Sequence, residues 1–252
     1  MSNTIALVTG GSRGLGRNTA IALARLGTDV VLTYHSNKAQ ADSAVAEIQK
    51  LGRKATALQL DTGNTSGFDA FVGELKKALK TTWNTDKFDQ LVNNAGTGLH
   101  AAFAETTEAQ FDSLMNVHVK GPYFLTQKLL PLMNDGGRIV MLSSGLARFS
   151  MAGVSAYASM KGAVEVLARC LAKELGPRGI AVNSFAPGAI ATDFGGGSVR
   201  DNPEVNKMVA ANTALGRAGE ADDIGPAIAS LLSPANRWIN GQRIEASGGM
   251  FV

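Results

Sequence analysis

Thiol chemistry is almost missing from this 252-residue chain, because Cys170 is its only cysteine. No disulfide can therefore form within the chain, and nothing in its cysteine usage indicates an oxidising compartment. Cys170 lies inside an apolar helical pattern and is interpreted as a packed side chain, not a catalytic thiol. The start of the chain, Met1–Val8, shows no basic region, apolar run or small-residue cleavage site. These features predict a cytoplasmic protein.

Long apolar runs and clusters of like charge are missing as well. No stretch approaches the roughly 18 consecutive apolar residues that span a bilayer, so no membrane association is expected. The net charge is +3, yet the longest basic runs are the pairs Arg53-Lys54 and Lys76-Lys77. Nucleic-acid binding needs clustered positive charge, so it is not predicted. The three histidines, His35, His100 and His118, share no close metal-ligand spacing, so no metal site is expected.

What the chain does contain is a regular alternation of short β-branched runs with long amphipathic ones. Strands are predicted at Ile5–Thr9, Asp29–Tyr34, Thr56–Leu60, Asp89–Val92, Arg138–Ser143, Ala181–Ala186 and Gln242–Glu245. Helices are predicted between them, at Leu15–Leu26, Lys38–Leu51, Phe68–Leu79, Thr107–Met133, Ala156–Glu174 and Ala221–Leu232. This order favours an α/β fold, a doubly wound (Rossmann-type) parallel sheet of seven strands with helices on both faces.

Local signals support these boundaries and a single domain. Thr107 followed by Gln110 forms a capping box at a helix start, and Gly27, Gly52 and Gly176 stand where three helices should end. No linker or composition shift divides the chain, so residues 1–252 are expected to form one domain. The irregular stretch Pro187–Asn202 is long for a compact domain, and we expect residues 188–212 to form a mobile lid over the substrate.

In sheets of this kind ligands bind beyond the carboxyl ends of the strands, where the strand order reverses. The first strand leads into Thr9-Gly10-Gly11-Ser12-Arg13-Gly14-Leu15-Gly16 and then directly into a helix. Such glycines let the backbone approach a pyrophosphate that the helix N-terminus attracts. The spacing, G-x-x-x-G-x-G, differs from the usual dinucleotide motif, but its position between strand and helix favours nucleotide binding over a plain turn.

Two later strand ends carry polar residues that are weak signals separately. Asn93-Asn94-Ala95-Gly96 follows the fourth strand, where it is either a cofactor contact or a simple turn. Ser143 and Ser144 follow the fifth, ahead of Tyr157 and Lys161, which share one helix face at a spacing of i,i+4. A nearby ammonium should lower the tyrosine pKa and make Tyr157 a usable general acid or base.

Taken together, these motifs make the chain resemble the short-chain dehydrogenase/reductase family, in its compact single-domain branch. The glycine motif, Asn93-Asn94-Ala95-Gly96, Asn116, Ser144, Tyr157, Lys161 and Pro187-Gly188 occur in the family's order. The match runs from Ile5 to Gly248-Gly249-Met250.

The resemblance implies a set of four catalytic residues. Ser144 would polarise the substrate carbonyl, and Tyr157 would hand over the proton while the nicotinamide delivers a hydride. Lys161 would bind the nicotinamide ribose and depress the tyrosine pKa. Asn116 would hold a water that relays protons to Lys161. Ser143 is the rival for the serine role, and the family's serine-to-tyrosine spacing favours Ser144.

The resemblance also implies where NADP(H) would bind. The cofactor-binding residues would be Gly10, Ser12, Arg13, Gly14, Leu15, Gly16, Tyr34, His35, Ser36, Asp61, Asn93, Ala95, Gly96, Tyr157, Lys161, Pro187, Gly188, Ile190 and Thr192. The second strand ends in Thr33-Tyr34-His35-Ser36-Asn37, without the carboxylate that NAD-binding folds use for the ribose 2′-hydroxyl. Because Arg13 lies in the glycine loop, where it could meet a 2′-phosphate, NADP(H) is predicted.

The substrate is expected to be a small molecule, either a free ketone or aldehyde or a secondary alcohol. One alternative is a 3-oxoacyl thioester of acyl carrier protein, although the segment 133–137 lacks the basic cluster such reductases often show. Another is a non-catalytic NADP(H)-binding regulator, which the complete catalytic set argues against. Substrate choice is expected to lie with Leu146–Val154 and Phe194–Ala211. Family members pair long helices and C-terminal strands between subunits, so a homotetramer is predicted.

Overall fold

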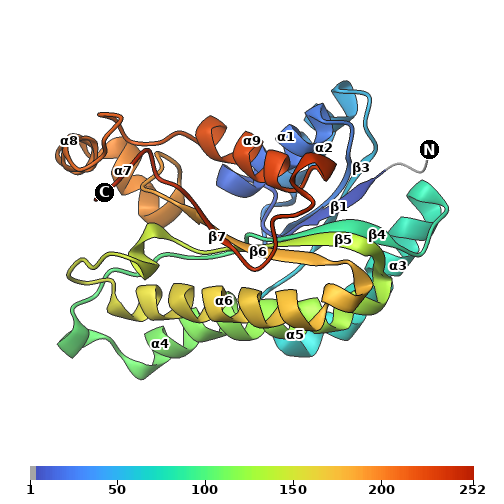
Figure 1. Ribbon diagram of the computed structural model, residues 1–252, viewed down its shortest axis with the longest axis horizontal. Helices are drawn as coiled ribbons and strands as arrows, with labels where there is room; N and C mark the ends of the chain where they lie inside the picture. The colour runs from blue at the N-terminus through green and yellow to red at the C-terminus, as the bar shows by residue number, and fades with distance from the viewer. Residues whose placement is uncertain (1–3) are drawn as a thin grey trace.

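The computed structural model describes residues 4–252, which form one seven-stranded parallel sheet between two layers of helices (Figure 1). The strands are β1 (Ile5–Val8), β2 (Asp29–Tyr34), β3 (Ala55–Gln59), β4 (Phe88–Asn93), β5 (Met133–Leu142), β6 (Ala181–Pro187) and β7 (Arg243–Ala246). Their order across the sheet is β3-β2-β1-β4-β5-β6-β7, and every neighbouring pair is parallel. The order reverses between β1 and β4. The predicted doubly wound fold is therefore confirmed.

Alternating side chains of the strands pack against different helical layers. The helices are α1 (Gly14–Arg25), α2 (Lys38–Lys50), α3 (Phe68–Trp83), α4 (Glu108–Met115), α5 (Gly121–Leu129), α6 (Ser155–Glu174), α7 (Ser198–Asp201), α8 (Pro203–Ala211) and α9 (Ala221–Leu231). In β1, Ala6 and Val8 pack in the cluster formed with α1, α2 and α9. Ile5 and Leu7 pack on the opposite face, with α3, α5 and α6. Because both faces are covered, the buried strands are largely apolar on both sides and include only a few polar residues, such as Thr33, Gln90 and Asn183.

The predicted helix Thr107–Met133 is wrong as one continuous element. The Thr107–Gln110 capping box is present and starts α4, as predicted. After α4 the backbone makes one π-helical turn, Asn116–Lys120, before α5 continues. A π-turn inserts an extra residue, and such turns are frequent at functional sites. Beyond α5, Pro131 lies in a short 3₁₀ turn, and β5 already begins at Met133.

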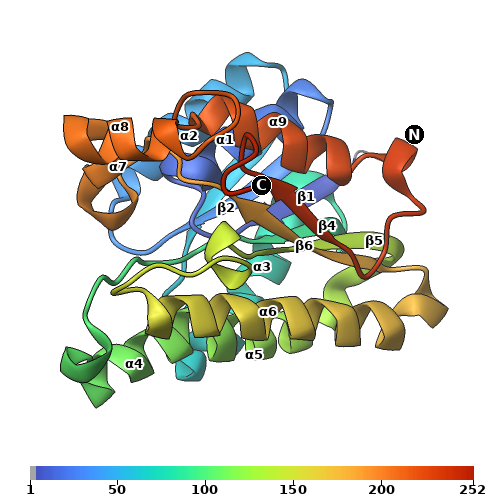
Figure 2. The same ribbon diagram turned by 60° about the vertical axis from the view of Figure 1, so that its left-hand side comes forward.

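Other boundaries differ from the predictions by a few residues. Gly27 and Gly52 follow α1 and α2 with left-handed φ angles of +91° and +76°, which confirms both stops. After α6 the left-handed residue is Gly179, not Gly176, because a 3₁₀ turn over Gly176–Arg178 intervenes. The predicted irregular stretch is only partly irregular, since α7 and α8 occupy its end. Figures 1 and 2 both place these two helices at one end of the molecule.

Candidate active site

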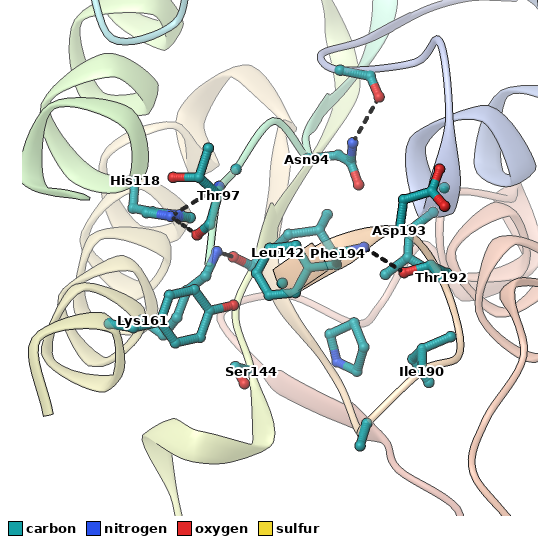
Figure 3. Close-up of a pocket in the computed structure, with 18 of the residues that line it drawn as sticks. Asn94, Thr97, His118, Leu142, Ser144, Lys161, Ile190, Thr192, Asp193 and Phe194 are labelled. Atoms are coloured by element: carbon teal, nitrogen blue, oxygen red, sulfur yellow. Dashed lines mark hydrogen bonds between the residues drawn. The ribbon is translucent and has the colours of Figure 1, made fainter. Parts of the chain in front are cut away.

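A cavity of about 620 Å³ opens beyond the carboxyl ends of β1, β4, β5 and β6 (Figure 3). It lies where the strand order reverses, which is the place predicted from the sequence. Segments far apart in the chain contribute to it: the loop after β1, the loop after β4, the start of α6 and the loop after β6. The parallel arrangement brings them together because all of these strands end at the same edge of the sheet.

The glycine loop forms one wall of the cavity. Gly10, Gly14 and Gly16 all line it, as do Ser12, Arg13 and Leu15. A Cβ atom on Gly16 would lie 2.2 Å from the carbonyl oxygen of Gly10, so only glycine allows α1 to start this close to the strand. At Gly14 no heavy atom lies within 4 Å of the Cβ position, so the backbone there is open. The loop is thus shaped to receive a ligand at the N-terminus of α1.

Asn94 ties the glycine loop to the loop after β4. Its side-chain amide donates to the carbonyl oxygens of Thr9 (2.8 Å) and Gly10 (3.2 Å), and the hydroxyl of Thr9 accepts from the backbone N–H of Asn94 and Ala95. Asn94 lines the cavity, whereas the predicted Asn93 does not and donates instead to the Thr126 hydroxyl in the interior. Neighbouring strand residues face opposite sides, so only one of the two asparagines can reach the cavity.

Of the cofactor-binding residues predicted at and near the end of β2, some line the cavity and others do not. His35 and Asp61 line the cavity, with His35 Nε2 3.7 Å from a carboxylate oxygen of Asp61. Tyr34 is buried in the cluster with α1 and α2, and Ser36 is exposed; neither lines the cavity. Arg13 lies exposed on the cavity wall.

Three of the four predicted catalytic residues meet in the cavity. Ser144 stands just after β5, where its hydroxyl accepts the Leu146 N–H (3.2 Å) and hydrogen-bonds the Tyr157 hydroxyl. Tyr157 and Lys161 are on adjacent turns of α6, with Lys161 Nζ 5.6 Å from the centre of the tyrosine ring. The Lys161 ammonium donates to the carbonyl oxygen of Leu142 (2.6 Å), which anchors it to the end of β5. The other strand-end serine, Ser143, bonds Glu165 on α6 as well as lining the cavity.

Burial sets the protonation of these groups. Removal from water raises the pKa of Tyr157 well above its usual range, and the Ser144 hydrogen bond only partly offsets this. Burial lowers the pKa of Lys161 to about 7. The Tyr157 pKa is therefore raised and not lowered as expected, and the causes of its shift are burial and the Ser144 hydrogen bond, not Lys161. At neutral pH Tyr157 keeps its proton and can act as a donor.

The π-turn after α4 places His118, not Asn116, at the cavity. Asn116 is half-buried and does not line it, and its carbonyl oxygen accepts the N–H of Gly121 within the turn. His118 lines the cavity, is 2% exposed and packs edge-to-face on Tyr157, with ring centres 5.3 Å apart. Nothing in the sequence pattern singles out His118, because its position depends on the extra residue of the π-turn.

The far wall, beside the predicted nicotinamide-binding loop, is largely apolar. Pro187, Gly188, Ile190 and Thr192 line the cavity as predicted, together with Phe194 on the segment that follows. Residues from Leu146–Val154 and from 194–211 contribute to it, which agrees with their predicted role in substrate choice. Further apolar lining residues are Leu146, Phe149, Met151, Val154, Val199, Val205, Met208, Val209 and Met250.

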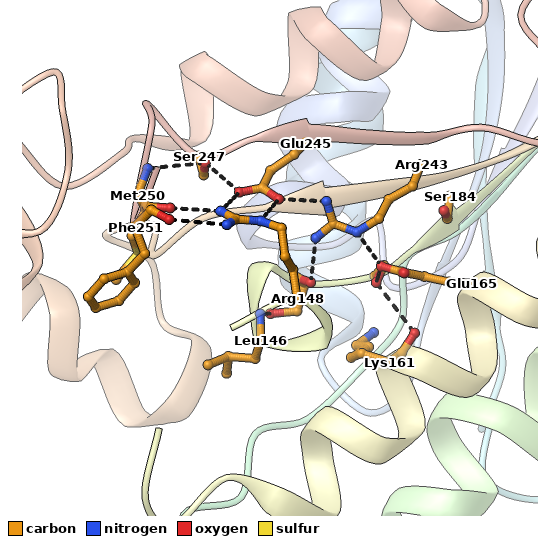
Figure 4. A network of polar contacts seen from close by, with 12 residues as sticks. Leu146, Arg148, Lys161, Glu165, Ser184, Arg243, Glu245, Ser247, Met250 and Phe251 are labelled. Atoms are coloured by element: carbon orange, nitrogen blue, oxygen red, sulfur yellow. Dashed lines mark hydrogen bonds and ion pairs between the residues drawn. The ribbon is translucent and has the colours of Figure 1, made fainter. Parts of the chain in front are cut away.

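A network of charged side chains contacts the backbone of the loop that carries Ser144 (Figure 4). Arg243 on β7 donates to the Ser144 carbonyl oxygen (3.2 Å) and to the carboxylates of Glu165 (2.7 Å) and Glu245 (2.5 Å). Arg148 binds Glu245 through two nitrogens and also reaches the backbone oxygens of Met250 and Phe251. These arginines hold the pKa of Glu245 near 2, since both stabilise its carboxylate. The network therefore ties the chain end and α6 to the loop that carries Ser144.

Within residues 4–252, no group of three or more histidine, cysteine, aspartate or glutamate side chains could hold a metal ion. No helix in the same range is long and apolar enough to cross a membrane.

Comparison with known proteins adds a family and several relatives. The family model described as enoyl-(acyl carrier protein) reductase matches residues 10–251. An uncharacterized oxidoreductase of Methylorubrum extorquens is 35% identical over 250 residues, covering 99% of this chain and 98% of the relative. The reductase LugOII, described as promiscuous and as catalysing keto-reduction at C1 in lugdunomycin biosynthesis, is 40% identical with a TM-score of 0.94, covering 100% of this chain and 99% of that one. The angucycline C-6 ketoreductase LanV, solved with bound NADP, is 36% identical with a TM-score of 0.94, covering 98% and 95%.

Proposed function

The chain belongs to the short-chain dehydrogenase/reductase family, and from this premise we propose that it uses NADPH to reduce a ketone on a bulky, largely apolar molecule. It is an NADP(H)-dependent oxidoreductase, like the ketoreductase solved with NADP. One observation carries the proposal. Ser144, Tyr157 and Lys161 share a single cavity with the glycine loop and with the apolar far wall.

The residues present fit NADP(H). The close approach of α1 to Gly10, which a Cβ on Gly16 would prevent, leaves the loop's backbone free to face phosphates at a helix N-terminus. Arg13, exposed on that wall, would pair with the 2′-phosphate, and His35 and Asp61 would border the adenosine. Lys161 and the loop from Pro187 to Thr192 would hold the nicotinamide end.

The catalytic residues divide the work of carbonyl reduction between them. When bound, NADPH supplies the hydride that adds to the carbonyl carbon. Ser144 and Tyr157 present their hydroxyls side by side and would both hydrogen-bond the carbonyl oxygen. Because burial keeps the phenol protonated, Tyr157 holds the proton that this oxygen takes. Lys161, anchored on Leu142, keeps a positive charge near the phenolate that remains.

The proposed substrate class follows from the far wall. Phe149, Met151, Phe194, Met208 and Met250 offer apolar or aromatic surface to whatever occupies the cavity. A preformed apolar pocket with few polar groups binds apolar ligands and orients them through those few groups. The two ketoreductase relatives act on ketones, which agrees with a carbonyl held at Ser144 and Tyr157.

A thioester of acyl carrier protein is the main alternative, and the description of the matching family model favours it. A carrier protein is an acidic partner that needs a basic docking surface. The start of β5, the segment at which such reductases often show a basic cluster, does not provide one, since Asn134 and Asp135 are exposed there and Arg178 is paired with Asp135. We therefore favour a free ketone. A non-catalytic regulator would have no use for the assembled Ser144, Tyr157 and Lys161.

We also propose that the protein is a cytoplasmic homotetramer. Large apolar side chains are exposed in three places. Phe111, Tyr123 and Val166, on α4, α5 and α6, are 40%, 47% and 50% exposed. Trp238, ahead of β7, is 96% exposed, and Val252, after β7, is 93% exposed. Apolar surface of this kind supports subunit contacts. The cytoplasmic location agrees with a single, free cysteine.

The proposal is tested by following NADPH absorbance with a panel of ketones, aldehydes and alcohols. We expect turnover of multi-ring ketones and little turnover of short-chain ones, because only the former fill the apolar wall. Turnover of carrier-protein thioesters without turnover of free ketones would support the alternative.

The choice of cofactor is tested at Arg13. A charge-assisted hydrogen bond contributes about 1.5–3 kcal/mol, so Arg13→Ala should weaken NADPH binding roughly ten- to a hundredfold. NADH binding should hardly change, because NADH lacks the 2′-phosphate. Titration of both cofactors by fluorescence measures this. Equal losses for NADPH and NADH would show that Arg13 does not contact the phosphate.

A further inference from the structure

His118 is a buried ionisable residue at the catalytic pair that the mechanism above does not use. It lies on the π-turn Asn116–Lys120, which packs against α6. Its ring touches Tyr157 edge-to-face, and the charge of Lys161 acts on it. His118 and Lys161 lie at the same side of the cavity in Figure 3. Its place in the fold thus puts an imidazole beside the tyrosine and the lysine.

The hydrogen bonds of His118 define which of its nitrogens is free. Nε2 lies 2.8 Å from the carbonyl oxygen of Thr97, which can only accept, and 3.3 Å from the backbone nitrogen of Thr97, which can only donate. We assign the hydrogen to Nε2, because the contact with the carbonyl oxygen is the shorter of the two. Burial, reinforced by the charge of Lys161, lowers the His118 pKa to about 3, so the ring is neutral. Nδ1 is then an acceptor. It is buried and has no hydrogen-bond partner within residues 4–252.

A buried acceptor without a partner is costly and calls for one at the site. The Lys161 ammonium has three N–H groups, and the Leu142 carbonyl accepts one of them. Lys161 is also buried, so an additional acceptor would stabilise its charged form. The two side chains are therefore complementary. His118 Nδ1 lacks a hydrogen-bond donor, and the Lys161 ammonium has N–H groups besides the one that Leu142 accepts.

We propose that His118 is the positioning residue of this helix for Lys161: its Nδ1 accepts a hydrogen bond from the Lys161 ammonium through one water. In this way His118 takes over the role that the resemblance assigns to Asn116. The inference rests on the proposed function, because it concerns how the proton lost by Tyr157 is replaced. The π-turn is the structural cause, since it turns His118 toward α6 and keeps Asn116 out of the cavity.

Other groups around the pair are already engaged. On α6, Glu165 accepts from Ser143 and from Arg243 of β7. On the loop after β4, Thr97 presents its carbonyl to His118, and on β5 Leu142 presents its carbonyl to Lys161. Tyr157, held neutral by burial, has the Ser144 hydroxyl as a partner. Within residues 4–252, His118 Nδ1 thus remains a buried acceptor without a partner at this site.

Two conservative variants separate the two nitrogens of the ring. In His118→Asn an amide oxygen can replace Nδ1, but the side chain is too short to reach Thr97. In His118→Gln the amide can reach Thr97 as Nε2 does, but nothing replaces Nδ1. His118→Leu removes both contacts and keeps the site apolar. Asn116→Ala tests the residue that the resemblance favours.

We expect His118→Gln and His118→Leu to lower kcat for the ketone by about tenfold or more, with NADPH binding within about threefold of wild type.

Without the acceptor, the charged form of Lys161 is less stable and its pKa falls. Activity that requires charged Lys161 declines as the pH rises through that pKa, near 7 in the wild type. In both variants this decline should move about one pH unit lower. His118→Asn should keep most of kcat and the wild-type profile, and Asn116→Ala should lose less than His118→Leu.

A readout without turnover distinguishes failure of this inference from failure of the proposed function. In protein labelled with ¹⁵N-histidine, the Nδ1 signal of His118 should stay that of an unprotonated acceptor and should shift as Lys161 titrates. The shift should vanish in Lys161→Met. An Nδ1 signal that ignores Lys161, or a His118→Gln enzyme with wild-type kcat and pH profile, would overturn the inference. If no ketone is turned over by the wild type, the proposed function fails, and the nuclear magnetic resonance titration still decides the role of His118.

Discussion

At the scale of single residues, burial is the dominant influence on the site. It keeps Tyr157 protonated, brings the Lys161 pKa to about 7 and keeps His118 neutral. A protonated phenol beside a lysine that titrates near neutral pH is suited to giving one proton away and receiving another. Arg243 donates to the backbone carbonyl oxygen of Ser144 and so helps to hold the loop that carries this hydroxyl.

Tyr157→Phe tests the proton donor. The variant keeps the ring and its contact with His118, so no cavity is created and stability should change little. It removes the proton and one hydrogen bond to the carbonyl oxygen, and loss of general acid catalysis typically costs about 10²–10⁴-fold in rate. We expect kcat to fall by at least this factor, with NADPH binding retained, as measured by stopped-flow absorbance and fluorescence titration.

Tyr123→Phe is the matched control, because Tyr123 is half exposed on α5 and does not line the cavity. Its kcat should stay close to wild type. A Tyr157→Phe enzyme that kept more than about a tenth of wild-type turnover would show that another group donates the proton.

At the scale of elements, the segment after β6 is marked by three consecutive glycines. Gly195, Gly196 and Gly197 all have left-handed φ angles, of +61°, +73° and +78°, which other residues rarely adopt. The three glycines connect the cavity-lining Phe194 to α7, so they can act as a hinge. Arg200 pairs with Asp193 and Asp201, which bridges the two sides of the hinge at an exposed position. Exposed ion pairs of this kind contribute little to rigidity.

We expect residues 188–212 to form a lid that orders when NADPH binds. Amide hydrogen exchange should be fast in this segment of the free protein and slower by about tenfold or more with saturating NADPH. The strands β4 and β5, buried in the sheet, serve as the internal reference and should exchange slowly in both states. Slow exchange of the segment in the free protein, unchanged by the cofactor, would contradict a lid.

At the scale of the whole molecule, the fold of one chain and the proposed association of subunits depend on different apolar surfaces. Helices cover both faces of the sheet, so the protein has a complete core of its own. The outer surfaces of α4, α5 and α6 nevertheless expose Phe111, Tyr123 and Val166 to solvent. The chain end, which Arg148 holds against the Ser144 loop, exposes Val252. Subunit contacts at the chain end would therefore bear directly on the site.

We predict a solution mass of about four times the 26.2 kDa chain, measured by light scattering. Val166→Glu should split the tetramer, because a charge in an apolar interface is not compensated. Lys50→Glu, at an exposed position on α2 in the other helical layer, is the control for a charge change and should leave the mass unchanged. A wild-type mass of about one chain would rule the tetramer out.

Much of this protein followed from local sequence. The alternation of apolar runs predicted the parallel sheet, because strands buried on both faces must be apolar. The Thr107–Gln110 box started a helix as predicted, since a capping box needs only residues three apart. Ser144, Tyr157 and Lys161 could be chosen because two of them share one helix face and the third ends a strand.

Only the tertiary structure determined which residues reach the cavity and how Tyr157 is protonated. The extra residue of the π-turn brought His118 to Lys161 and left Asn116 aside, because backbone hydrogen bonding there depends on packing against α6. The alternation of strand faces chose Asn94 over Asn93 for the cavity. The protonation of Tyr157 was likewise decided by its burial, which only the assembled layers of α6, β5 and the lid produce.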